Sequence, residues 1–448
     1  MHATKNCDDV SNASTIHWQD FGSIVHMTAF LDMPQLPHGE TFALVGRWMD
    51  DGFDRGCVAM VVSAGRIESI VSMAPDGMGA AHASSPAIPA RRFHSAMLSP
   101  GFVDLQVNGG FGFEVGNDPQ ALRELAARLP ATGVTAFLPT LVSRAESDYA
   151  PAFCAFAEAT RDIRRASAAS ASAHMLGLHL EGPLLSLARR GAHAPEGIAA
   201  TSALSLRRIL AEAPDSSAIR VVTLAPERDD ALALIADLRA RDIAVSLGHT
   251  EASFEIATAA IEAGASLATH VFNAMPPLHH RNPGVVGAVL ADDRVTTLFI
   301  ADGVHVHPAV LKLAMRGKPA RRRALVTDAI SAAGLPPGSA GTALLAGQDL
   351  RIDATSARLA DGTLAGSTLT LDRAVRNTRA FTDLAVADVL RMVTSVPAAA
   401  IQAQPHGRLS VGGAADIVML DDSLEVTATF VGGRLAFVRD GTLDAISR

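Results

Sequence analysis

Cysteine is scarce in this chain, and its placement gives no sign of a disulfide framework. The 448 residues include only three cysteines, Cys7, Cys57 and Cys154, and no CxxC pair. An odd number of scattered cysteines is typical of proteins in a reducing compartment rather than of secreted, cross-linked scaffolds.

Long apolar runs and a basic excess are also missing. No run of about 18 apolar residues could span a membrane, and residues 1–20 lack the apolar core of a signal peptide. Asp and Glu number 46 against 38 Lys and Arg, a net charge of −8, whereas nucleic-acid binders usually carry a basic excess. The sequence therefore predicts a cytoplasmic protein with no nucleic-acid or membrane partner.

Enough apolar sequence is present to bury a large core. Hydrophobic residues make up 48% and charged residues 19% of the chain, and the length suits one large domain plus a small one. Residues 1–40 are polar and without period, which indicates a variable extension. The segment from Gly77 to Pro89 is rich in Ala, Gly and Ser and reads as a loop.

Both ends of the remaining chain favour β-structure. Short apolar runs punctuated by turn residues occur at 42–45, 57–62 and 65–71, and again at 415–420, 426–431 and 435–438. Gly432 and Gly433 lie between the last two runs, which is typical of a β-hairpin. We expect residues 41–98 and 403–448 to form one small β-sandwich domain from both termini.

The middle of the chain alternates apolar strands with amphipathic helices. Eight strand candidates lie at 102–107, 134–138, 175–180, 219–224, 243–247, 266–269, 297–300 and 324–327, and helical patterns at 120–129, 230–240 and 253–263 separate some of them. A doubly wound sheet is the alternative, but no GxGxxG follows the first strand. The pattern favours a (β/α)8 TIM barrel over residues 99–402.

Imidazoles and carboxylates follow several of these strands. Glu181, His249 and His270 come at three strand ends, and Asp328 follows the eighth strand. Catalytic groups of a barrel project from the carboxyl ends of its strands. Three N/O ligands with an open position could hold Zn²⁺ or a similar ion, leaving Asp328 as general base and acid. The alternative is that these histidines are surface or satisfied core residues.

Several sequence blocks resemble the N-acetylglucosamine-6-phosphate deacetylases of the amidohydrolase superfamily. The resemblance covers about residues 42–440. Its blocks are PGFVDLQVNGG at 100–110, GLHLEGP at 177–183, RGAHAP at 190–195, LGHT at 247–250, THVFNAMP at 269–276, ADGVH at 301–305, VTDA at 326–329 and LAGS at 364–367. The resemblance implies deacetylation of N-acetylglucosamine 6-phosphate to glucosamine 6-phosphate and acetate in amino-sugar catabolism.

The resemblance also assigns roles to residues. It makes Glu181, His249 and His270 ligands of one divalent ion per subunit, expected to be Zn²⁺, and Asp328 and His193 catalytic. The implied substrate contacts are Ala192, His193, Asn273, Ala274, Arg281, His305, Leu364, Ala365 and Gly366. Arg281 and His305 would bind the phosphate, which a chain of net charge −8 must hold through local cations. The resemblance further implies a homodimer whose partner supplies the Arg281 loop.

Two departures from the wider superfamily indicate a single metal ion. Many amidohydrolases carry an HxH pair after strand one, but here the place reads Gln106-Val-Asn108, as in some of the resembling deacetylases. Binuclear members often add a carboxylated lysine after strand four. The three lysines here, Lys5, Lys312 and Lys318, all lie elsewhere.

Three alternative functions stay open. The same reaction on N-acetylgalactosamine 6-phosphate differs at one sugar hydroxyl, which sequence does not separate. A ring-opening amidohydrolase, such as a dihydroorotase or hydantoinase relative, is disfavoured by the missing HxH pair and lysine. A barrel that has lost catalysis is disfavoured by the joint presence of Glu181, His249, His270 and Asp328.

Overall fold

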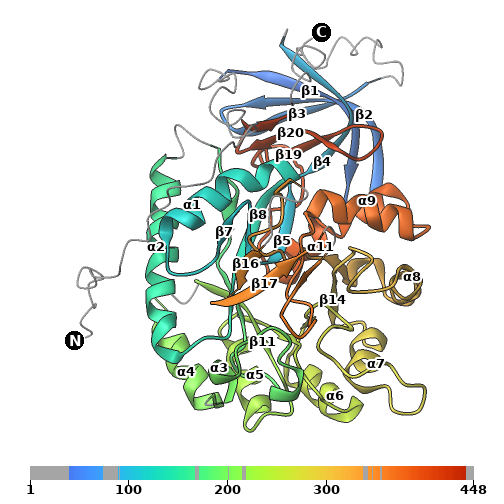
Figure 1. The fold of residues 1–448 in the computed structure, drawn as a ribbon. Helices are drawn as coiled ribbons and strands as arrows, with labels where there is room; N and C mark the ends of the chain where they lie inside the picture. The colour runs from blue at the N-terminus through green and yellow to red at the C-terminus, as the bar shows by residue number, and fades with distance from the viewer. Residues whose placement is uncertain are drawn as a thin grey trace. The chain divides into compact units, whose positions relative to one another are not determined.

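The computed structural model describes most of the chain (Figure 1). The described residues are 40–73, 89, 91–166, 171–199, 201–213, 218–336, 342–345, 347–353 and 356–439. The predicted extension over 1–40, except Glu40, and the predicted loop over 77–89, except Pro89, lie outside them. Within the described part of the chain, no helix combines the length and apolar character needed to cross a membrane.

Eight parallel strands form the sheet at the centre of the fold. In order of pairing they are β15 (Arg323–Leu325), β14 (Thr296–Phe299), β13 (Leu267–Ala268), β12 (Ala244–Leu247), β11 (Ile219–Leu224), β10 (Leu178–Glu181), β8 (Val134–Val142) and β5 (Phe102–Val107). Nearly all of their residues are buried, as expected for parallel strands covered on both faces. The predicted (β/α)8 barrel is therefore confirmed.

The barrel closes between its first strand and the residues after its last one. Val107 and Ala329 form a parallel bridge. The backbone N–H of Asp328 donates to the carbonyl of Gln106 over 3.0 Å, and the N–H of Asn108 donates to the carbonyl of Ala329 over 2.8 Å. This seam brings the residues that follow strand one beside those that follow strand eight.

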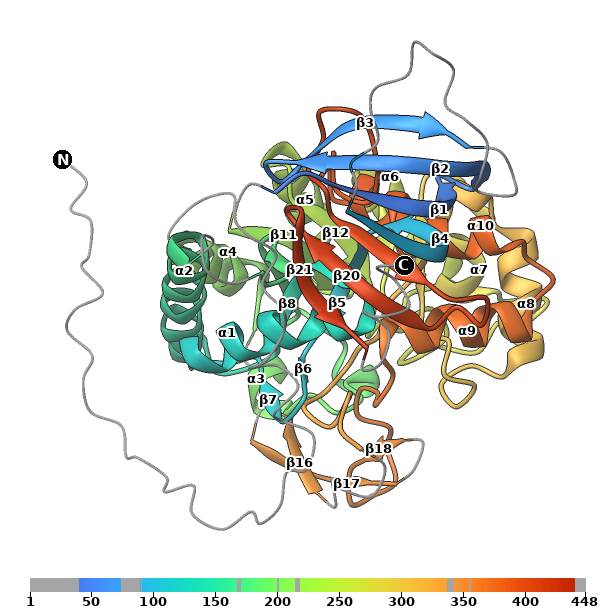
Figure 2. The same ribbon diagram turned by 90° about the horizontal axis from the view of Figure 1, so that it is seen from above.

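Helices surround the strands (Figures 1 and 2). They are α1 (Pro119–Arg128), α2 (Tyr149–Ala166), α3 (Pro195–Ala199), α4 (Ala203–Ala211), α5 (Ala231–Ala240), α6 (Phe254–Ala263), α7 (Gly284–Ala291), α8 (Pro308–Gly317), α9 (Leu371–Phe381), α10 (Val386–Arg391) and α11 (Ser395–Ala400). Asp118, Ser202 and Ser253 each cap a helix by accepting a hydrogen bond from a backbone N–H of its first turn. The apolar faces of the helices and the strands share one large core.

One predicted strand is divided in the structure. Residues 175–180 form two strands, β9 (His174–Met175) and β10, because Gly177 between them has φ of 134°. A Cβ on Gly177 would lie 2.3 Å from Cγ of Arg220. The apolar run predicted the strand correctly, but the glycine breaks its ladder.

A second, seven-stranded sheet combines both ends of the described chain. Its order is β21 (Arg434–Val438), β20 (Val426–Val431), β19 (Ile417–Leu420), β4 (Arg92–Pro100), β1 (Phe42–Asp50), β2 (Phe53–Ser63) and β3 (Arg66–Ser72). Gly432 and Gly433, with φ of 54° and 71°, make the predicted hairpin turn. The additional β domain of the predicted fold class is thus confirmed, whereas its division at 41–98 plus 403–448 stays a prediction.

Small strands complete the fold. A ribbon of β6 (Gly109–Gly110) and β7 (Phe113–Glu114) follows strand one. A three-stranded sheet of β16 (Thr342–Leu345), β17 (Gln348–Ile352) and β18 (Ala357–Arg358), which the sequence pattern did not predict, follows strand eight. Its buried Leu350 belongs to a separate apolar cluster with Ala192 and Ala365.

Candidate active site

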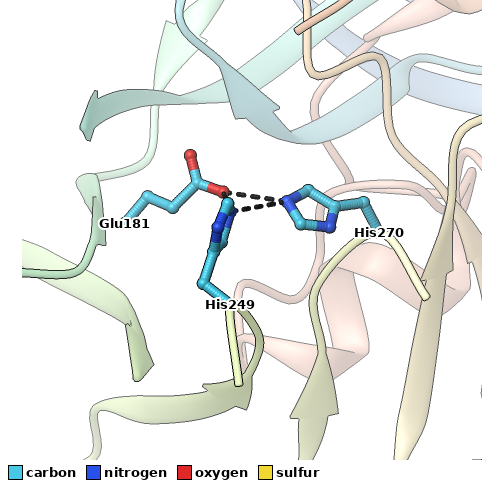
Figure 3. A group of neighbouring side chains, drawn as sticks. All are labelled: Glu181, His249 and His270. Atoms are coloured by element: carbon cyan, nitrogen blue, oxygen red, sulfur yellow. Dashed lines mark hydrogen bonds and ion pairs between the residues drawn. The ribbon is translucent and has the colours of Figure 1, made fainter. Parts of the chain in front are cut away.

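The three predicted metal ligands meet at the carboxyl ends of three barrel strands. Glu181 ends β10, His249 follows β12 and His270 follows β13. Nε2 of His249 and Nε2 of His270 lie 3.1 Å apart, and they lie 3.2 and 3.1 Å from Oε1 of Glu181. All three side chains are buried, and their ligand atoms lie within 4.8 Å of one another (Figure 3).

The donor set fits a divalent metal ion. Nδ1 of His249 lies 2.9 Å from the carbonyl oxygen of Arg189, which can only accept, so Nδ1 bears the proton of the neutral ring. Nε2 of this tautomer presents its lone pair to Oε1 of Glu181, 3.2 Å away, as two ligands of one cation would. Ligand atoms of a tetrahedral Zn²⁺ site stand about 3.4 Å apart for bonds of about 2.0–2.1 Å, close to the separations seen.

Backbone conformation aims these side chains. His249, His270 and Asp328 have φ of 49°, 26° and 51°, in the left-handed region that residues other than glycine rarely adopt. Such strained positions cluster at functional sites. Each one turns the chain sharply where a strand ends, so the side chain lies over the end of the barrel.

Glu181 is held in its ionised form. Burial opposes the charge, but contacts with the imidazoles of His249 and His270 outweigh it, and the pKa of the carboxyl lies well below its usual range. An ionised carboxylate is the form that binds a metal ion.

His193 presents a proton donor to the same space. Its Nδ1 accepts a hydrogen bond from the backbone N–H of Ser143 over 3.1 Å, and its Nε2 lies 3.7 Å from Oε2 of Glu181. Burial lowers the pKa of His193 to about 3, so the ring is neutral at physiological pH. Because Nδ1 accepts, Nε2 is the nitrogen that bears the proton.

Asp328 is held by two amides that the sequence pattern indicated only as poor metal ligands. Its Oδ1 accepts from Nδ2 of Asn108 over 2.7 Å and from Nε2 of Gln106 over 3.1 Å. Gln106 Nε2 also donates to Oε1 of Glu181 over 2.8 Å, which links the carboxyl to the ligand cluster. Burial, followed by the nearby charge of Glu181, raises the pKa of Asp328 to about 6.

The predicted loop at residues 364–366 lies against Asp328. The N–H of Ser367 donates to the carbonyl of Asp328 over 2.8 Å. Gly366 has φ of 58°, and a Cβ there would come within 2.8 Å of that same carbonyl oxygen. Ala365 is fully buried, and the carbonyl of Ala192 accepts a hydrogen bond from Gln348 of the three-stranded sheet. The structure therefore brings Gly366 and Ser367 beside Asp328 and places Ala192 beside the three-stranded sheet.

The other predicted substrate contacts divide into two groups. Asn273 and Ala274 follow His270, and Nδ2 of Asn273 donates to the His270 carbonyl over 3.0 Å. His305 is almost fully buried at its side chain, and its Nδ1 lies 2.6 Å from Oδ2 of Asp302. Arg281 is exposed, and the hydrogen bonds described for it stay within its own loop, to His279 and His280.

Comparison with known proteins gives a consistent result. A model of the amidohydrolase family matches residues 97–436. The chain is 36% identical over 346 residues to N-acetylglucosamine-6-phosphate deacetylase of Bacillus subtilis, covering 77% of this chain and 85% of the relative. It is 37% identical over 342 residues to N-acetylgalactosamine-6-phosphate deacetylase of Escherichia coli O157:H7, covering 76% and 88%.

A solved structure extends the likeness to the fold. It is a variant of N-acetyl-D-glucosamine-6-phosphate deacetylase from Mycobacterium smegmatis in complex with N-acetyl-D-glucosamine-6-phosphate. The TM-score is 0.79 at 31% identity, with 89% of this chain and all of that chain covered.

Proposed function

The chain belongs to the amidohydrolase family, and on this basis we propose that it hydrolyses the N-acetyl group of N-acetylglucosamine 6-phosphate. The products are glucosamine 6-phosphate and acetate, which places the reaction in amino-sugar catabolism. The observation that supports this best is the convergence of Glu181, His249 and His270 beside the buried carboxyl of Asp328. The scattered cysteines support a cytoplasmic location.

Glu181, His249 and His270 are the proposed ligands of one divalent ion. Two imidazoles and one carboxylate suit Zn²⁺. When bound, the ion supplies a positive charge that polarises the acetyl carbonyl and acidifies the attacking water.

Asp328 and His193 then perform the remaining steps. Asp328, ionised near neutral pH with a pKa of about 6, takes a proton from the attacking water as the new C–O bond forms. It passes this proton to the sugar nitrogen, so that the C–N bond breaks and a neutral amine leaves. The Nε2–H of His193 donates to the carbonyl oxygen while negative charge develops on it.

Direct assay tests this function. Purified protein is incubated with N-acetylglucosamine 6-phosphate, acetate and free amine are quantified, and the metal content of the same sample is measured. We expect equal amounts of both products, loss of activity with chelator and recovery with Zn²⁺. Asp328→Asn should retain metal and sugar while kcat falls about 10²- to 10⁴-fold. A normal kcat in this variant would contradict the assignment of Asp328.

A second candidate substrate is N-acetylgalactosamine 6-phosphate, because a relative of similar sequence identity is named N-acetylgalactosamine-6-phosphate deacetylase. The two sugars differ in the orientation of one hydroxyl group. The ratio of their kcat/KM values in the same assay decides between them.

We propose that Arg281 and His305 bind the phosphate and that Arg281 acts across a homodimer. The guanidinium of Arg281 bonds to neighbouring His280 within its own loop. Because Arg281 is exposed, it is accessible to the substrate of a second subunit. His305 belongs to the same subunit as Asp328, and Asp302 orients it by accepting from its backbone N–H and by contacting its Nδ1.

Substitution of Arg281 tests this arrangement. Arg281→Ala should raise KM for the phosphorylated sugar and spare unphosphorylated N-acetylglucosamine, because only the charged contact is lost. Mixing inactive Asp328→Asn subunits with Arg281→Ala subunits should restore part of the activity in heterodimers. Equal effects on both sugars, or no recovery on mixing a demonstrated heterodimer, would remove Arg281 from this role.

A further inference from the structure

Two amide side chains at the end of strand one bind the carboxylates of the site. Gln106 Nε2 donates to Oε1 of Glu181 and Oδ1 of Asp328, and Asn108 Nδ2 donates to that same Oδ1. Both amides are buried, with 0% and 2% of their surface exposed. We infer that Gln106 and Asn108 are positioning residues that fix the carboxyl of Asp328 and leave its Oδ2 to exchange the proton. The inference rests on the proposed role of Asp328.

The chemistry of the contacts determines how the amides are turned. An ionised carboxylate only accepts hydrogen bonds, so an amide that faces it must present its N–H₂ group. The amide oxygens of Gln106 and Asn108 are then left buried with no partner among the described residues. A merely structural pair would gain from satisfying these oxygens, because a buried unpaired acceptor destabilises the fold.

The backbone of Asp328 is already fixed, so only the torsions of its side chain remain to be set. Its N–H donates to Gln106 and its carbonyl accepts from Ser367, over 3.0 and 2.8 Å. Two donors on Oδ1 oppose rotation of the carboxyl group. Within the described part of the chain no hydrogen bond reaches Oδ2, which is therefore the oxygen available to water and to the leaving amine.

The same geometry argues against the amides as metal ligands. An amide binds a cation through its oxygen, because its nitrogen has no available lone pair. Here the nitrogen of Asn108, at 2.7 Å, and not its oxygen, faces Asp328. The place that many amidohydrolases fill with ligating histidines thus holds hydrogen-bond donors to the general base.

The two amides differ in a way that an experiment can use. Among the described residues, the side-chain amide of Asn108 donates to Asp328 alone, whereas that of Gln106 also donates to the proposed ligand Glu181. In the metal-loaded enzyme, Asn108→Leu, of similar shape, should lower kcat at least tenfold with KM within twofold and metal content unchanged. Gln106→Leu should lower both kcat and metal affinity.

Comparison with Asp328→Asn separates positioning from a structural effect. If Asn108 acts through Asp328, then Asn108→Leu should cause no further loss of kcat in the Asp328→Asn background. Asn377→Leu is the matched control, since it removes an amide whose described hydrogen bond goes to the carbonyl of Ala301, over 2.8 Å, and not to Asp328. It should leave kcat within twofold.

Each outcome bears on a definite claim. Three results would overturn the inference. They are a normal kcat in Asn108→Leu, the same proportional loss of kcat when Asn108→Leu is made in the Asp328→Asn background, and a loss of metal together with kcat. An inactive unsubstituted chain, or a fully active Asp328→Asn, overturns the proposed function and this inference with it. If Asn108→Leu fails to fold by circular dichroism, Asn108→Ser, whose donor is too short to reach, replaces it with the same expected results.

Discussion

Single backbone groups decide what the buried imidazoles of this site can do. The carbonyl of Arg189 directs the lone pair of His249 toward Glu181, and the N–H of Ser143 directs the proton of His193 into the site. The two rings lie with centroids 4.6 Å apart, yet Nε2 of His249 presents a lone pair and Nε2 of His193 presents a proton. The difference arises from the backbone, because both side chains are histidine.

Metal binding can be tested against a matched histidine. His249→Ala should lower the metal content of the purified protein, because one of three ligands is lost. His179 is equally buried, but its two nitrogens bond to the Leu105 carbonyl and the Thr223 hydroxyl. His179→Gln should therefore leave the metal content unchanged even if it destabilises the fold. Full metal occupancy in His249→Ala would show that the ligand set is wrong.

At this scale the sequence identified side chains better than it identified their orientation. Glu181, His249, His270 and Asp328 were predicted as site residues because reactive groups follow apolar strands at a barrel end, and the structure brings these four side chains together. The groups that orient the histidines could not be found this way, since Ser143 and Arg189 act through backbone atoms and every residue has those. Gln106 and Asn108 were noticed only as missing ligands, because their partners lie on other strands.

The secondary structure elements were predictable where one strong pattern governs them. Continuous apolar runs predicted each of the eight barrel strands, because such strands are covered on both faces. The run at 175–180 was predicted as one strand and is two, because Gly177 adopts a φ of 134°. The three-stranded sheet after strand eight was not predicted, since its strands are short and few of their residues are deeply buried.

That small sheet packs against residues beside the candidate site and against Val142 at the end of β8. Leu350 is fully buried in a cluster with Ala192 and Ala365 that is separate from the main core. Leu350→Ala should therefore raise KM several-fold with little change in Tm, because a local loss of about 2–4 kcal/mol falls on a cluster separate from the main core. Leu44→Ala, in the core of the seven-stranded sheet, is the control and should lower Tm with KM unchanged. The opposite pattern would show that Leu350 supports the global fold.

At the scale of the whole molecule, a buried carboxylate joins the barrel to the seven-stranded sheet. Asp416, just before β19, lies 3.4 Å from Nε2 of His174 on β9 and 3.5 Å from Nδ1 of His406. Its carbonyl also accepts from the N–H of Gly101, over 2.9 Å, between the two sheets. Burial opposes its charge, but the two histidines outweigh it and hold the pKa of Asp416 below its usual range.

This junction should make stability depend on pH. Because the pKa of Asp416 is depressed, its contribution is present above about pH 4 and lost as pH falls further. Burial opposes the charge of His174, but Asp416 raises the pKa of this histidine above its usual value of 6.5. The contribution of His174 to the free energy of unfolding is therefore present below pH 6.5 and lost at higher pH. Asp416→Asn should therefore cost most unfolding free energy near pH 5–6 and less at pH 9, as measured by urea unfolding.

Asp421→Asn is the matched control for this measurement. Asp421 pairs with Arg439 at a half-buried site, and an arginine does not titrate over this range. Its small effect on unfolding free energy should be the same at pH 5.5 and pH 9. An equally flat profile for Asp416→Asn would show that the histidines do not contribute to the junction.

The order of the seven-stranded sheet also has a consequence for synthesis. Strand β4 pairs with β19 along one edge, but β19 leaves the ribosome roughly 300 residues later, a delay of tens of seconds at about 5–20 residues per second. Throughout that interval β1 to β4 would form a half-sheet whose open edge can pair with the wrong strand. A nascent chain stalled before β19 should therefore bind chaperones and be cleaved by protease far more readily than the released protein.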